Sequence, residues 1–76
     1  MPATLTDAAA DRMVEIRVRC AKRTPPVRYN ELAAEAGLAY STTRNVMSGN
    51  VDWDPTSALD KLEAAMDRIE AGEVEA

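Results

Sequence analysis

The chain has 76 residues with one Trp, two Tyr and no Phe, and its formal net charge is −4. This length allows one small domain without a separate ligand-binding domain, and no apolar stretch reaches the roughly 18 to 20 residues that span a bilayer. With a single cysteine and no histidine, no internal disulfide can form and we expect no metal site. The amino terminus lacks the pattern of a signal peptide, so we expect a cytoplasmic protein.

The charges are distributed unevenly along the chain. Residues 1–55 carry seven basic and seven acidic side chains, whereas residues 56–76 carry two basic and six acidic ones and hold the whole net charge of −4. A basic run without any acid lies in the first part, and a local patch of this kind can attract phosphate although the whole chain is acidic. The alternative interpretation is an ordinary solvated helix surface. The run consists of Arg17, Arg19, Lys22, Arg23 and Arg28.

The first predicted helix covers residues 7–23. Asp7 and Asp11 stand early and basic residues stand late, which suits the helix dipole. Pro25 and Pro26 end this helix, because proline has no N–H to donate and disfavours helical backbone in the residue before it.

Capping residues, a glycine and apolar spacing predict three further helices. Together with the first helix they indicate a small all-α domain of four helices. Asn30 is the expected cap of a helix over residues 30–36, which Gly37 ends. A third helix is expected over residues 41–48. A fourth covers residues 55–71, because Asp54 followed by Pro55 is a typical helix start. Its apolar face repeats at three- and four-residue steps. This face consists of Leu59, Leu62, Met66 and Ile69.

The stretch from Glu31 to Gly49 meets the requirements of two short helices packed across a tight turn. Ala33 is a small residue where the helices touch, and Gly37, four positions later, tolerates the positive φ that the turn needs. Four apolar residues are expected to point into the angle between the helices. These are Leu32, Ala36, Leu38 and Val46.

This stretch resembles the helix-turn-helix of the lambda repressor-like (Cro/CI, XRE) family and, secondarily, the DNA-reading headpiece of the lac repressor family. The resemblance covers about 20 of the 76 residues. The helices predicted before and after the motif favour the lambda repressor-like arrangement, whereas the run Lys61 to Met66 resembles the third helix of a lac-type headpiece. The shared features are Glu31-Leu32-Ala33, Ala36-Gly37-Leu38, Ser41-Thr42, Val46 and Gly49.

Two positions depart from the family pattern. Ala39 stands where these families often have a capping Ser or Thr, so Ser41 is expected to cap the second helix of the motif instead. Thr43 stands where Val or Ile is common, and its inward hydroxyl would need a hydrogen-bond partner.

The resemblance implies that helix 41–48 reads the major groove of double-stranded DNA. Arg44 could then pair with guanine and Asn45 with adenine, although both could also be ordinary solvent-facing residues. About half of the basic residues 17–23 are expected to help, since one helix cannot turn all of them to the same side. The expected DNA-binding residues are Tyr40, Ser41, Thr42, Arg44 and Asn45, with Arg28 and Tyr29 at a flanking phosphate.

The resemblance implies a transcriptional regulator of the phage or prophage repressor or Cro-like type, and therefore a bacterial or phage-infected cell as its host. Such proteins commonly bind as two-fold dimers, so a homodimer is a possible partner. The apolar face of helix 55–71 could supply a dimer surface, but we expect it to complete the core of the monomer. No residues suggest catalysis or a cofactor, so we expect no enzyme.

Two other functions remain open at this point. The acidic tail favours a protein-interaction module or a DNA-mimic inhibitor built on a helix-turn-helix scaffold. The second is an architectural DNA-binding factor similar to a phage excisionase, which would bend DNA rather than repress.

Overall fold

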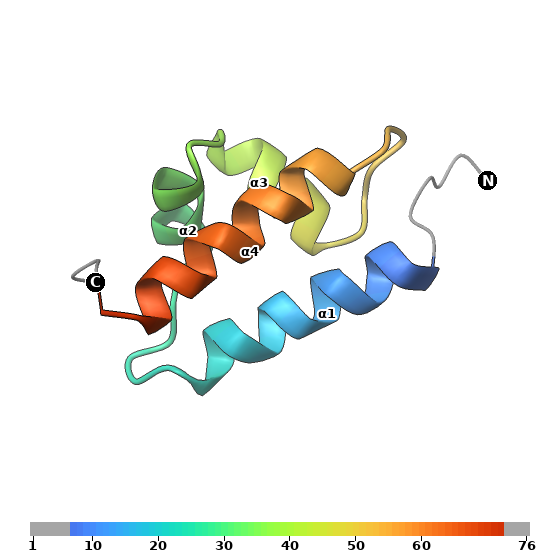
Figure 1. Cartoon of the computed structure of the whole chain (residues 1–76). Coiled ribbons are helices and arrows are strands. Elements are labelled where there is room, and N and C mark those ends of the chain that lie inside the picture. The colour runs from blue at the N-terminus through green and yellow to red at the C-terminus, as the bar shows by residue number, and fades with distance from the viewer. Residues whose placement is uncertain (1–6, 73–76) are drawn as a thin grey trace.

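The computed structural model of the protein describes residues 7–72 and consists of four α-helices joined by short connections (Figure 1). No strand occurs within this range, so the predicted all-α class and the number of helices are confirmed for the described part. Each predicted helix boundary lies within one residue of the observed one, a difference typical of helix ends. The helices are α1 (Asp7–Lys22), α2 (Tyr29–Ala36), α3 (Tyr40–Met47) and α4 (Thr56–Glu70).

Helices α1 and α4 lie side by side and run in the same direction, as Figure 1 shows. Arg12 of α1 contacts Glu63 of α4, and Arg19, seven residues later, contacts Glu70, also seven residues later. This equal advance along both helices is what a parallel pair requires. Helices α2 and α3 pack against each other, and both also contact α4.

The hydrophobic core lies between these helices and takes its largest share from α4. Its predicted apolar face is buried completely, together with Ala58 and Ala65. Helix α1 contributes Ala9, Met13, Ile16 and Cys20, and its Val18 is exposed. The prediction that the α4 stripe completes the monomer is therefore confirmed, and this stripe is not free to form a dimer surface.

The connection between α2 and α3 consists of residues 37–39, and Gly37 has the left-handed conformation that the sequence predicts, with φ 72°. The N–H of Leu38 donates to the carbonyl of Ala33 at 2.9 Å, which closes the end of α2. Ala33, Leu32 and Val46 are buried where the two helices meet, and Ala36 and Leu38 pack partly buried against the core.

Arg68 of α4 holds the carboxyl-terminal end of α2. Its Nη2 donates to the backbone carbonyl of Glu35 at 2.8 Å, and its Nε donates to the carboxylate of the same residue. An arginine thus satisfies a carbonyl in the last turn of α2, where the helix has no intrahelical donor to offer.

The structure corrects two predicted helix caps. Asn30 is not a cap, because α2 begins at Tyr29 and Arg28 occupies the N-cap position; the Arg28 N–H donates to Glu31 Oε1 at 3.1 Å. Ser41 is not a cap either, because α3 begins at Tyr40 after Ala39, and no side chain caps its first turn.

The predicted cap of α4 is corrected as well, because the helix begins at Thr56, Pro55 occupies the N-cap position and no side chain caps it. Asp54 instead binds Thr56 from the position before the cap. Its Oδ1 accepts hydrogen bonds from the Thr56 N–H at 3.0 Å and from the Thr56 hydroxyl at 2.6 Å. The hydroxyl bond and then the backbone bond lower the pKa of the Asp54 carboxyl below its ordinary value.

Thr43 points into the core, as its position in the motif predicts. The residue is completely buried, and its hydroxyl has no hydrogen-bond partner among residues 7–72. A buried hydroxyl without a partner costs free energy, so α3 carries a local instability at the centre of its buried face.

Candidate functional site

Three of the seven arginines are engaged in ion pairs on the side of the molecule where α4 lies. Arg12 donates to Asp60 and, from Nε and Nη2, to Glu63 at 2.9 and 2.8 Å. Arg19 repeats this arrangement with its own pair of acids on α4, Asp67 and Glu70. The third is Arg68, bound to Glu35 of α2.

These ion pairs change the electrostatics of α4. The hydrogen bonds from Arg12 lower the pKa of Glu63, and those from Arg19 lower the pKa of Glu70. The same bonds raise the pKa of both guanidinium groups above their usual value. The acidic surface of α4 is therefore partly neutralised from within the protein, and Arg12 and Arg19 are not available to a partner.

The other four arginines, Arg17, Arg23, Arg28 and Arg44, make no ion pair or side-chain hydrogen bond within the described range. Arg23 is partly buried and lines neither of the two hollows described next, whereas the side chains of Arg17, Arg28 and Arg44 are exposed. They come from three different elements, namely α1, the residue before α2, and α3, and they converge on two adjoining surface hollows.

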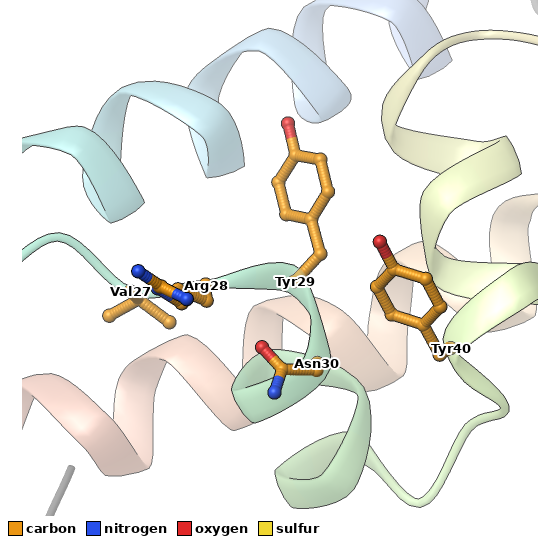
Figure 2. A pocket seen from close by; sticks show the side chains of 5 residues that line it. All are labelled: Val27, Arg28, Tyr29, Asn30 and Tyr40. Atoms are coloured by element: carbon orange, nitrogen blue, oxygen red, sulfur yellow. The ribbon is translucent and has the colours of Figure 1, made fainter.

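The first hollow, which we call the Arg28 hollow, lies where α2 and α3 begin (Figure 2). Figure 2 shows Tyr29 extending from the start of α2 toward α1, with Tyr40 beside it at the start of α3. Asn30 and Arg28 lie on the other side of Tyr29, and Val27 completes the lining. The hollow thus combines two phenols, an amide and an unpaired guanidinium, which can all donate hydrogen bonds.

The second hollow, the Arg44 hollow, shares both tyrosines with the first. Arg17 enters it from α1 and Arg44 from α3. Ser48 also lines it, with its hydroxyl donating to the carbonyls of Arg44 and Asn45 at 2.9 and 3.2 Å. The two hollows therefore form one continuous surface with three unpaired positive charges. Met47 completes the lining of the second.

The structure brings together four of the seven residues that the sequence analysis selected: Arg28, Tyr29, Tyr40 and Arg44. The other three, Ser41, Thr42 and Asn45, line neither hollow. Ser41 and Asn45 are exposed and Thr42 is partly buried.

The exposed side of α3 carries two lanes of residues, because positions four apart lie above one another on a helix. Tyr40, Arg44 and Ser48 form the lane along the hollow. Ser41 and Asn45 form the neighbouring lane, which is open to solvent. The helix can therefore present an arginine and an asparagine next to each other on one surface.

Sequence reasoning missed two contributors to this surface, Asn30 and Ser48, and left open which of the basic residues of α1 belong to it. The sequence predicts Asn30 as a helix cap and Ser48 only as the end of a helix. Arg17 was placed among the basic residues of α1 without being separated from Arg19, although two residues of a helix differ by roughly 200° in direction. That angle was the available signal, because it forces Arg17 and Arg19 to opposite sides.

Comparison with protein-family models, with curated proteins and with solved structures finds no match to this chain. Among the described helices none is long and apolar enough to cross a membrane. No group of three or more Asp, Glu, Cys or His side chains is positioned to hold a metal ion between residues 7 and 72.

Proposed function

We propose that the protein binds double-stranded DNA in a sequence-specific manner and regulates transcription, as a repressor or Cro-like protein of the lambda repressor-like helix-turn-helix type. One observation carries the proposal: unpaired arginines from three elements converge beside the exposed side of α3, whereas the arginines facing α4 are neutralised by its acids.

The segment from α2 to α3 supports a helix-turn-helix in its details. The turn is three residues long, Gly37 has a positive φ, and the small Ala33 is buried. The outer side of α3 is exposed and carries side chains that donate hydrogen bonds. A second helix held in this way can enter the major groove while the first lies across the backbone.

We infer different roles for the residues in the two lanes of α3. Arg44 and Asn45 project from adjacent lanes and can pair with the edges of guanine and adenine respectively. Tyr40, Ser41 and Thr42 lie in the first turn, within reach of phosphates and nearby base edges. Around the rim, phosphate contacts would come from Arg17, Arg28, Tyr29 and Asn30.

The ion pairs of α4 favour a DNA-binding function over that of a DNA-mimic inhibitor, whose partner would be a DNA-binding protein. A DNA mimic presents unpaired carboxylates, but Arg12 and Arg19 occupy Glu63 and Glu70. Residues 73–76, which hold the rest of the acidic tail, lie outside the described residues. An excisionase-like factor would use the same surface and would differ by bending its DNA.

The experiment that tests the proposal is selection of bound duplexes from a random DNA pool, followed by titrations at several salt concentrations. We expect a short, two-fold symmetric site and an affinity that falls as salt rises, because phosphate contacts release counterions. Measuring the bend of the selected duplex by fluorescence energy transfer separates a repressor from an architectural factor. If no sequence is enriched and no DNA binds at low salt, the proposal is wrong.

Arg44→Ala gives a sharper test of the reading helix. The variant should weaken binding to the selected site by roughly 1 to 3 kcal/mol and relax preference at one base pair. Lys61→Ala is the matched control, because Lys61 is exposed on α4, makes no ion pair within residues 7–72, and loses the same charge. If the two substitutions weaken DNA binding equally, the loss of one positive charge explains the effect, and Arg44 has no specific role in base recognition.

A further inference from the structure

Helix α1 exposes an apolar stripe on the side opposite its buried face. Val14 is 49% exposed and Val18, one turn later, is 43% exposed. Ala21 continues the stripe, and a shallow groove extends it to Pro26 beyond the end of the helix. Two half-exposed branched aliphatic residues in one contiguous groove differ from the isolated apolar residues that are common on protein surfaces.

We propose that this stripe is a homodimer interface, covered by α1 of a second copy of the chain in antiparallel orientation about a two-fold axis. The face of α4, which the sequence suggested as a candidate dimer surface, is buried in the monomer and cannot serve. The α1 stripe, in contrast, is open in the monomer, and its centre lies between Val14 and Val18. An antiparallel pair therefore places Val14 of each copy against Val18 of the other.

One pair of charges beside the stripe is complementary in the antiparallel arrangement. Asp11 lies on the first half of α1 and Lys22 at its end, and both are exposed. Eleven residues separate them, close to three turns of roughly 3.6 residues, so they lie on the same edge of the stripe. Antiparallel pairing about the centre of the stripe brings Asp11 of one copy opposite Lys22 of the other.

The other edge of the stripe carries Arg17, which lines the Arg44 hollow. In an antiparallel helix pair the two-fold axis runs perpendicular to both helices, so the Arg17 edges of both copies lie on the same side of the dimer. Both Arg44 hollows then face in one direction, as a palindromic DNA site requires. This last step rests on the proposed function, whereas the dimer itself does not.

Sedimentation velocity of the full chain over a range of concentrations tests the interface. We expect a dimer that dissociates on dilution, and we expect Val14→Lys with Val18→Lys to raise its dissociation constant at least about tenfold. Both positions are half-exposed, so thermal unfolding should show a folded monomer. The control is Ala34→Lys with Ala64→Lys, which adds the same charge at exposed positions of α2 and α4 and should leave the dimer intact.

A charge exchange tests the orientation. Asp11→Lys and Lys22→Asp should each weaken the dimer several-fold, and the double variant, which has the original net charge, should restore it. A wild-type chain that stays monomeric at all concentrations overturns the proposal. A dimer that survives both valine substitutions overturns it too, and a double exchange without recovery overturns the antiparallel arrangement.

DNA binding separates this inference from the proposed function. The valine double variant should bind a single half-site as the wild type does and lose the cooperative binding of two adjacent half-sites. A valine-dependent dimer without any DNA affinity would leave the interface standing and remove the proposed function. Cooperative binding that is unchanged in the variant would remove the interface and leave DNA binding standing.

Discussion

Arg19 of α1 donates two hydrogen bonds to Glu70 of α4, from Nε to Oε2 at 2.9 Å and from Nη2 to Oε1 at 2.6 Å. This pairing turns Arg19 away from the surface that its neighbour Arg17 shares with Tyr29 and Arg44. Two arginines that are separated by a single residue therefore serve different purposes. One stabilises the contact between helices, and the other supplies positive charge to the proposed DNA surface.

Substituting each arginine by glutamine should separate these purposes. Arg17→Gln should weaken DNA binding across all sequences and reduce the slope of log affinity against log salt by about 1, because one phosphate contact is lost. Arg19→Gln should leave that slope nearly unchanged and lower the free energy of unfolding by about 0.5 to 1 kcal/mol, measured by urea denaturation. The assignment is wrong if Arg19→Gln changes the slope as much as Arg17→Gln does.

Replacing the buried threonine of α3 should stabilise the protein. Thr43→Val keeps the shape of the side chain and removes a hydroxyl without a partner, so the free energy of unfolding should rise by about 1 kcal/mol. The midpoint of urea unfolding measures this change. Thr42→Val, at the partly exposed neighbouring position, is the control and should change stability by less than about 0.5 kcal/mol. A loss of stability in Thr43→Val would mean that the hydroxyl finds a partner.

Acid should destabilise the fold through the carboxylates of α4. Hydrogen bonds from arginine lower the pKa of Glu63 and Glu70 in the folded state below the ordinary value of 4.5. The unfolded chain therefore binds protons first as pH falls, and the stabilisation, which is complete above about pH 5, is lost as pH drops through the folded-state pKa values.

Thermal unfolding between about pH 7 and pH 3 measures this dependence. The double variant Arg12→Gln with Arg19→Gln should be less stable at neutral pH and should show a shallower loss in acid, because its carboxylates titrate closer to their ordinary pKa. If the variant and the wild type lose stability in parallel, other carboxylates determine the acid response.

In the turn between α2 and α3, replacing Gly37 by any other residue should lower the free energy of unfolding. Gly37 has φ +72°, and a Cβ added there would meet no atom within 4 Å. The cost of Gly37→Ala is therefore backbone strain alone, about 1 kcal/mol in urea denaturation. Gly37→Asn should lower the free energy of unfolding by less, because asparagine tolerates the left-handed region better than alanine does. Equal losses for the two variants would point to a cause other than backbone conformation.

The helices and the turn between α2 and α3 could be predicted from the sequence, because they depend on interactions between residues that are close together in the chain. The end of α2 follows from the left-handed conformation of Gly37, and α4 begins at Thr56, whose N–H donates to Asp54. The apolar face of α4 follows from helical spacing and is buried as that spacing predicts. Each of these features depends on residues within a few positions of one another.

The distribution of the arginines could not be predicted in the same way. The partners of Arg12 and Arg19 lie about fifty residues later in the chain, and nothing near either arginine indicates them. The absence of a cap on α3 could not be predicted either. The helix begins at Tyr40 without any capping side chain, and Val46 and Thr43 of its buried face pack into the core.

The parallel contact between α1 and α4 also has a consequence for synthesis of the chain. A ribosome releases α1 first, but the helix that covers its buried face follows about fifty residues later. Until then the core around Met13 and Ile16 is incomplete, so both apolar side chains are open to nonspecific contacts in the nascent chain. Folding is therefore expected to wait until α4 has left the exit tunnel, so the surface that carries Arg17, Arg28 and Arg44 forms only after α4 has been synthesised.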